Sequence, residues 1–222
     1  MKKLCFFFAA LALLFACSPV DDNSGTDSAT VPDGAVDLGL SVYWASCNVG
    51  AKAPEEYGDY YAWGETETKS NYSWSTYKFG TSWSGPFSKY NTSSSYGTVD
   101  NKTILEPDDD VAHVKLGGSW RMPTDAEWTE LRENCTWTWT TQNGVNGRLV
   151  TSNKNGNSIF LPAAGNRFGT LLYDAGSYGD YWSSSLNTGY TSAAWYVYFD
   201  SANVSRYDYY RYYGFSVRPV SE

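Results

Sequence analysis

The 222-residue sequence predicts an α+β fold in which short strands and long irregular connections outnumber helices. Three observations support this class. Apolar and polar residues alternate with a period of two in several short runs, which is typical of half-buried strands. Asn-Gly pairs follow one of these runs and favour a tight hairpin turn. One segment, 124–135, carries the capping residues and the three-to-four spacing of an amphipathic helix.

The N-terminal segment has the composition of an export signal. Two lysines precede an apolar run that is too short to span a membrane. The run ends in Leu14-Phe15-Ala16-Cys17, which resembles the bacterial lipobox, where the cysteine is acylated and becomes the first mature residue. We expect a lipoprotein signal peptide over residues 1–16 and lipidation at Cys17. A plain secretory signal with a chance cysteine is the alternative.

Residues 17–34 are polar and rich in Gly, Pro and Asp, so they predict a lipidated flexible tether. Acyl chains on Cys17 would hold the protein to a membrane without spanning it, and the lipid anchor would be its only membrane contact. The serine and paired acids after Cys17 resemble the export signal of surface lipoproteins in Bacteroidetes. We therefore expect a lipid-anchored protein of the outer membrane that is exposed on the cell surface.

Residues 35–222 are enough for one well-buried domain. The formal net charge is −8, and it becomes more negative once the two lysines of the signal are removed. Such an acidic chain lacks the basic surface that nucleic acid or anionic lipid requires. The arginines between 206 and 218 alternate with aromatic residues as in a nucleic-acid platform, but the acidity of the whole argues against that partner.

Two cysteines remain after the signal and the lipidation site. Cys47 and Cys135 form an even pair in an exported chain, which favours a disulfide between them. Two free buried thiols are the alternative, because the apolar neighbours of both cysteines suit either state.

The first half of the domain predicts strands followed by a long loop. Residues 36–51 alternate apolar and small residues and predict two short strands with a turn at Gly39. Residues 66–103 are rich in Ser, Thr, Tyr, Asn and Gly, and their aromatic residues favour an ordered irregular loop that lies on the core. These aromatic residues are Trp74, Tyr77, Phe79, Trp83, Phe87 and Tyr90.

The clearest helix begins after Thr124. Thr124 is a good N-cap residue, Asp125 suits the positive end of the helix, and Glu127 completes a capping box. The acidic run Asp108-Asp109-Asp110 predicts the cap of another short helix, with a calcium site as the alternative.

The second half predicts hairpins. Residues 136–152 form a hairpin turned at 143–144 or at 146–147, and a further turn at 155–156 leads into a strand at 158–165.

The C-terminal segment has the composition of a binding surface. Of the 19 tyrosines, ten lie between Tyr178 and Tyr213, with Asn, Ser, Asp and Gly between them. Tyrosine offers a large, stiff, amphipathic contact area, and the small polar residues add adaptable hydrogen bonds. An aromatic, hydrated β-structure with no special partner is the alternative.

Strand alternation separates this segment into two faces. Trp195, Val197 and Phe199 fall on one face, which we expect to be core, and Tyr196 and Tyr198 on the other. We expect one exposed ligand-binding surface made of Tyr190, Tyr196, Tyr198, Asn203, Ser205, Tyr207, Asp208, Tyr210 and Phe215.

Two motifs carry a family resemblance. Residues 120–131, WRMPTDAEWTEL, resemble the R-[LM]-P-T-x-A-E-W motif of formylglycine-generating-enzyme-like domains, and residues 211–220, RYYGFSVRPV, resemble their closing R-x-x-G-[FY]-x-x-R segment. Together with the segments 36–51, 61–66 and 161–167, they look like the Fibrobacter succinogenes major paralogous domain of exported Bacteroidetes proteins. The resemblance covers residues 36–220.

The resemblance implies a C-type-lectin-like fold whose closing strand lies near the N-terminal strands. It also implies that Arg218 is buried and bonded to carboxylate or carbonyl groups. We expect four tryptophans to be buried as well, namely Trp120, Trp128, Trp182 and Trp195. The variable proteins of diversity-generating retroelements share this scaffold and display a Tyr-, Asn-, Ser- and Asp-rich face near the C-terminus, which the tail here resembles.

The sequence argues against an enzyme. Formylglycine-generating enzymes bind copper through two cysteines in the C-terminal part of the domain, and this chain has no cysteine after Cys135. The single histidine, His113, is expected to pack near Trp120 or Leu116 and is a poor basis for a Ser-His-Asp triad. Zinc requires more His and Cys than are present. We therefore expect no catalytic residues, no metal and no cofactor.

Three functions compete at this point. The first is a surface-displayed binding module for a protein or a glycan, such as a diversified receptor or adhesin. The second is a structural or assembly lipoprotein of the envelope that has no soluble ligand. The third is a degenerate enzyme with residual catalysis.

Overall fold

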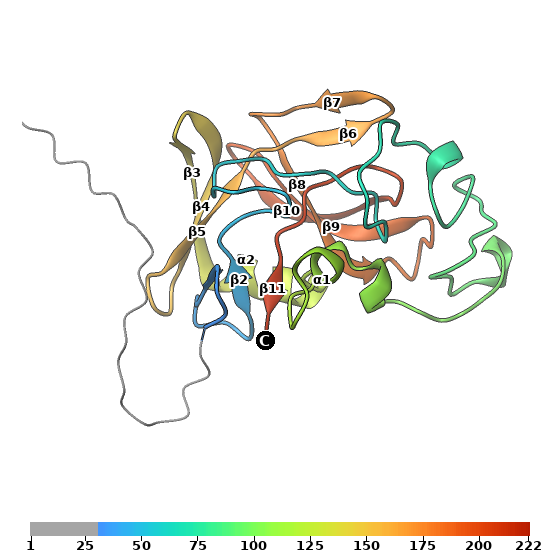
Figure 1. The fold of residues 1–222 in the computed structure, drawn as a ribbon, viewed down its shortest axis with the longest axis horizontal. Helices are drawn as coiled ribbons and strands as arrows, with labels where there is room; N and C mark the ends of the chain where they lie inside the picture. Colours follow the sequence, from blue (N-terminus) through green and yellow to red (C-terminus); the bar gives the residue numbers. More distant parts are fainter. Residues whose placement is uncertain (1–30) are drawn as a thin grey trace, which may run out of the picture. The chain divides into compact units, whose positions relative to one another are not determined.

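The computed structural model describes residues 31–222, which pack together as one unit (Figure 1). The predicted signal peptide, the predicted lipidation site Cys17 and most of the predicted tether lie outside the described residues. Within the described part, no helix is both long and apolar enough to cross a membrane.

The described chain combines two short α-helices with four small antiparallel sheets, which confirms the α+β class. One sheet has the order β1-β2-β11, with β1 Ala35–Val36, β2 Tyr43–Ala45 and β11 Val220–Ser221. A second has the order β3-β4-β5, with β3 Cys135–Gln142, β4 Val145–Ser152 and β5 Ser158–Pro162. A third has the order β10-β9-β8, with β8 Gly179–Leu186, β9 Ala193–Phe199 and β10 Val204–Tyr210. A hairpin forms the fourth, with β6 Asn166–Phe168 and β7 Leu171–Tyr173.

The two ends of the domain meet in the first sheet. The last strand, β11, pairs with β2 so that Val220 lies opposite Trp44 (Figure 1). Backbone bonds between Val220 and Arg121 hold the other side of β11. The closing strand therefore lies beside the N-terminal strands, as expected.

The Arg218 side chain anchors this closure. It is fully buried, and its Nε donates to the Oδ1 of Asn48 at 2.9 Å. Its Nη1 donates to the carbonyls of Ala45 and Ser46, and its Nη2 to the carbonyl of Phe160 at 2.8 Å. The prediction of a buried Arg218 bonded to carbonyl groups is confirmed. Its acceptors come from β2, from the loop after β2 and from β5, so one side chain joins three parts of the fold.

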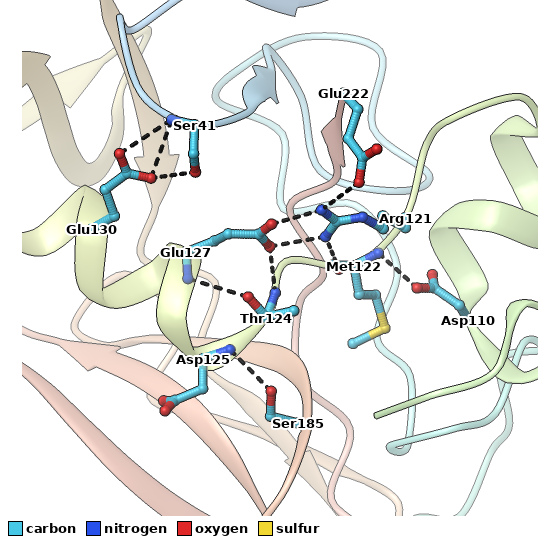
Figure 2. A network of polar contacts seen from close by, with 10 residues as sticks. All are labelled: Ser41, Asp110, Arg121, Met122, Thr124, Asp125, Glu127, Glu130, Ser185 and Glu222. Atoms are coloured by element: carbon cyan, nitrogen blue, oxygen red, sulfur yellow. Dashed lines mark hydrogen bonds and ion pairs between the residues drawn. The ribbon is translucent and has the colours of Figure 1, made fainter. Parts of the chain in front are cut away.

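Both predicted helix caps are present. In α2, Asp125–Asn134, the Thr124 side chain accepts from the backbone N–H of Glu127, and Glu127 accepts in return from the N–H of Thr124 (Figure 2). In α1, Val111–Leu116, the Asp110 carboxylate accepts the N–H groups of the first turn. The second Asp110 oxygen accepts from the N–H of Met122, which ties α1 to the segment before α2.

The capping carboxylate of α2 also forms an ion pair. Arg121 donates from its two terminal nitrogens to the two oxygens of Glu127, at 2.9 and 2.6 Å (Figure 2). It also reaches the C-terminal residue Glu222 at 3.2 Å. Charge-assisted pairs of this two-point geometry fix orientation as well as adding stability. The ion pair therefore links the start of α2 to the end of the chain.

The long segment 66–103 lies on the core with little regular structure. It contains two short 3-10 turns, η1 Trp74–Thr76 and η2 Ser94–Tyr96. A third, η3 Pro107–Asp109, precedes α1. Four of the aromatic residues that were predicted to hold the segment 66–103 on the core are buried, namely Tyr77, Phe79, Phe87 and Tyr90. Trp74 is half-buried but packs against the hydrophobic core, with its ring centroid 4.8 Å from that of Tyr212, whereas Trp83 is exposed and does not anchor the loop as expected.

Strand β8 separates two hydrophobic clusters and is buried at every position. On one side, Tyr181 packs with the residues of α2, β4 and β5. On the other, Trp182 packs with the aromatic residues of the long segment and the closing segment. Because β8 is closely packed on both faces, it holds the neighbouring strand β9 in a fixed position.

Two expectations about the core are wrong. Cys47 and Cys135 are free thiols, because Cys135 packs in the cluster beside α2 whereas Cys47 lies half-buried at the end of the first sheet. Trp128 and Trp182 are buried, but Trp120 and Trp195 are only half-buried. Trp195 points away from the core, and the guanidinium of Arg206 covers its ring at 3.3 Å.

Arg218→Ala is expected to destabilise the domain by about 3 to 5 kcal/mol, because it leaves buried acceptors without donors. Arg132→Ala is the matched control, since Arg132 is a half-buried arginine of α2 outside this network. Urea unfolding of the wild type and both variants measures the effect. An Arg218→Ala protein as stable as the control variant would contradict the anchoring role.

Candidate functional site

The predicted aromatic face lies on β9 and β10, whose pairing places its residues. Tyr196 lies opposite Tyr207, and Tyr198 lies opposite Ser205. Directly opposed residues of an antiparallel pair share one face of the sheet, so these four do. Phe199 points to the other face and packs in the cluster beside α2. The predicted separation of the two faces is therefore confirmed for these residues.

Only part of this face is exposed. Tyr207 is 54% exposed, but Tyr196 is 8% exposed and Phe215 only 2%. The ring of Phe215 stacks on Trp182 with centroids 4.2 Å apart, and Tyr196 packs against Phe215 at 4.8 Å. The expected exposure of Tyr196 and Phe215 is wrong, because the closing segment packs directly onto the sheet.

The remaining predicted residues lie elsewhere. Asp208 is paired with Trp195 and therefore lies on the opposite face of the sheet. Asn203 is exposed in the turn between β9 and β10. Tyr190 and Tyr210 contact one another through their hydroxyls at 3.2 Å. The nine residues thus do not form the single exposed patch that the sequence suggested.

A cavity of about 350 Å³ lies where this face meets the β6–β7 hairpin and the closing segment. We call it the aromatic cavity. Its lining residues are Asn166, Phe168, Tyr173, Asp174, Tyr178, Asp180, Tyr196, Tyr198, Tyr209, Tyr213 and Phe215. Eight of these eleven are aromatic, so the cavity offers mainly ring surface to a ligand.

The β6–β7 hairpin reaches the cavity through its alternation. Asn166 and Phe168 of β6 line the cavity, while Arg167 between them lies over the ring of Tyr60 at 5.1 Å. Gly165 precedes β6 with a φ of +64°, and a Cβ there would lie 2.0 Å from the carbonyl oxygen of Tyr173. Only glycine fits this approach, and it lets the hairpin fold back over the sheet.

The walls of the cavity pack against one another. Phe168 stacks on Tyr213 with centroids 5.0 Å apart, and Tyr213 meets Tyr209 edge-on at 4.5 Å. On the other side, Tyr178 contacts Tyr198 at 5.4 Å. Rings that support each other in this way hold their orientation without a ligand. The site is therefore largely formed in advance.

Asp180 places a carboxylate in this aromatic surrounding. It is 4% exposed, and its Oδ2 accepts a hydrogen bond from the Nδ2 of Asn166 at 3.0 Å. Burial, with a smaller contribution from the nearby charge of Asp174, raises the pKa of Asp180 to about 6, although the hydrogen bond from Asn166 opposes this shift. Neither Lys nor Arg is among the residues that line the cavity. The cavity is thus aromatic and acidic.

The rim of the cavity is apolar and exposed. Leu171 and Tyr173 of β7 are exposed, as is Phe168, which lies opposite Leu171 on the same face of the hairpin. Contiguous exposed apolar surface on a soluble domain usually marks an interaction site. The rim therefore extends the contact area beyond the cavity.

Sequence reasoning missed eight of the lining residues, namely Asn166, Phe168, Tyr173, Asp174, Tyr178, Asp180, Tyr209 and Tyr213. A partial signal was present. Asp180 alternates with the buried Tyr181 and pairs with Tyr198, so the period of β8 already puts it on the tyrosine face. The Gly169-Thr170 pair between short apolar runs also indicates the β6–β7 hairpin.

Other candidate chemistry has structural roles in the described chain. Asp109 binds Lys78 and Lys89, and Asp110 caps α1. His113 lies in α1 with its Nδ1 3.3 Å from the carbonyl oxygen of Trp120, near the predicted neighbour. Within residues 31–222, no three His, Cys, Asp or Glu side chains are grouped to hold a metal ion.

Asp180→Asn is expected to remove a pH-dependent loss of stability. The raised pKa means that the folded state keeps a proton that the unfolded state releases near the ordinary Asp value. Wild-type stability should therefore fall by about 3 kcal/mol from this group as pH rises from about 4 to above 6.

Urea unfolding across that pH range measures the effect, and Asp108→Asn, an exposed carboxyl outside the cavity, is the control. The Asp180→Asn protein should be more stable than the wild type near neutral pH. The same pH dependence in wild type and Asp180→Asn would show that Asp180 does not bear this cost.

No family model matches the chain, and neither a curated protein nor a solved structure matches it. The observations that bear on the function of the site are an aromatic cavity formed in advance, a buried carboxylate and an exposed apolar rim.

Proposed function

We propose that this protein is a surface-displayed lipoprotein whose domain binds a protein or glycan ligand. The aromatic cavity and its rim form the binding site, together with the exposed part of the tyrosine face at Tyr207. One observation carries the proposal, namely a cavity of about 350 Å³ with eight aromatic lining residues, beside exposed apolar side chains. A domain without a ligand would be expected to fill such a cavity or cover it.

The scaffold that we propose is C-type-lectin-like. Three features support it: the short helices and small antiparallel sheets, the pairing of the closing strand with β2, and the buried Arg218 of the closing motif. In this proposal the domain acts by binding alone, without catalysis and without a cofactor. The ligand-binding residues belong to β6–β10 and to the closing segment.

Anchoring is the part of the proposal that depends on the N-terminal segment. Cys17→Ser is expected to release the protein from the membrane fraction, or to leave it unprocessed, because the acylated thiol is lost. Fractionation and gel mobility of the wild type and the variant measure this. Cys47→Ser is the control, since Cys47 is a free thiol within the domain. A Cys17→Ser protein that fractionates and migrates like the wild type would exclude lipidation.

Ligand binding is tested with glycan and protein arrays probed with the purified chain. Once a ligand is found, Tyr198→Ala and Tyr173→Ala should each weaken its binding by about 1 to 3 kcal/mol with little effect on folding. Both side chains line the cavity and neither is fully buried. Tyr190→Ala is the control, because Tyr190 lies outside the cavity.

Two outcomes would count against this site. If both variants are folded and bind as the wild type does, the aromatic cavity is not where the ligand binds. If no ligand is found on either array, the structural or assembly lipoprotein becomes the better account.

A further inference from the structure

We propose that the aromatic cavity binds an organic ammonium group. The proposal rests on the binding function above and names the chemical class of the ligand, or of the part of the ligand that enters the cavity. It follows from the combination of a buried carboxylate, a wall of aromatic rings and the lack of any cationic side chain among the lining residues.

Asp180 has no cationic partner among the residues that line the cavity. Asp180 accepts one side-chain hydrogen bond, from Asn166 to its Oδ2, and its Oδ1 accepts none within the described chain. Asp174 adds a second carboxylate to the same cavity. The nearest arginine in sequence, Arg167, points to the other side of β6 and lies over Tyr60. A cation in the cavity would supply the partner that Asp180 lacks, and a buried charge without a partner is costly.

Aromatic rings form most of the wall of the cavity. Eight rings line the cavity, and the negative face of an aromatic ring attracts a cation within about 6 Å of its centre. An ammonium group that carries carbon substituents combines a positive charge with apolar surface, so it gains from the rings and from Asp180 together. Cavities of several aromatic rings with an acidic residue are well suited to such groups.

The polar groups of the cavity suit an ammonium group better than a neutral sugar. A sugar ring can stack on tyrosine, but its hydroxyls need both donors and acceptors around it. Here one N–H of the Asn166 amide donates to Asp180 and the Tyr198 hydroxyl donates to Asp200 at 2.8 Å, so the side-chain donors left for a sugar are the second Asn166 N–H and the other tyrosine hydroxyls. A neutral sugar would also leave the charge of Asp180 without compensation. The same cavity therefore favours a cation over a neutral polyol.

The ammonium group can come from two sources, a small molecule or a lysine side chain of a protein partner. Isothermal titration of the purified chain with choline and with Nα-acetyl-lysine methylamide compares them. The decisive control is 3,3-dimethylbutan-1-ol, which has the shape of choline without its charge. We expect a cation to bind at least about tenfold more tightly than this neutral isostere. Preference for choline indicates a small-molecule ligand, and preference for the lysine derivative indicates a protein.

Variants connect the binding to the cavity. Asp180→Asn keeps the shape of the side chain and removes its charge, so it should weaken cation binding at least about tenfold and leave binding of the neutral isostere unchanged. Tyr190→Phe, outside the cavity, should change neither. Equal binding of choline and its isostere, no binding of either cation, or unaltered cation binding by a folded Asp180→Asn protein would overturn the proposal.

The result also separates this proposal from the general one. An array ligand that Tyr198→Ala loses, but that neither choline nor the lysine derivative displaces, would leave the binding module standing and exclude the ammonium group. If the cations bind and Asp180→Asn abolishes their binding, the ligand class is established even before the natural partner is identified.

Discussion

The rest of the described fold depends on the hydrogen bonds that the guanidinium of Arg218 makes. The guanidinium is buried without a carboxylate, and four oxygen acceptors from β2, the loop after β2 and β5 surround it. Burial lowers the pKa of Arg218, which expresses the cost of keeping a charge there. The cost is offset because the acceptors are held in place by β2, the loop that follows it and β5, so the closing segment has one position in which the charge is satisfied.

That position also determines the shape of the aromatic cavity. The closing segment runs beside β8, where the N–H of Ser216 donates to the carbonyl of Asp180. On its other side, the N–H of Phe215 donates to the carbonyl of Tyr61. Gly214 passes so close to Tyr72 that a Cβ would lie 2.5 Å from its ring. Phe215 therefore lines the cavity as a consequence of how the chain closes. Scaffold and site share the same residues, so changes in the anchor are transmitted to the cavity.

Features that depend on contacts between residues close in the sequence could be predicted, and features that depend on contacts between distant segments could not. The Thr124 cap rests on neighbours within a few residues and was predictable, and the hairpin turn at Asn143-Gly144 is one of the two turns that the sequence offered. The burial of Tyr196 was not, because it depends on the closing segment, which a strand pattern does not show. Trp195 alternates like a core residue, yet Arg206 of the adjacent strand covers it instead. The cavity itself required the β6–β7 hairpin to fold back over the sheet, and no local signal specifies that contact.

The meeting of the chain ends in one small sheet gives the domain a polarity. The entry of the described chain at β1 and its end at β11 lie on one side, and the β6–β7 hairpin lies on the opposite side (Figure 1). The chain that leads into β1 therefore joins the domain on the side remote from the β6–β7 hairpin. The aromatic cavity, which the hairpin lines, is therefore remote from the sheet in which the described chain enters and ends, so a ligand can approach the cavity without contacting that sheet.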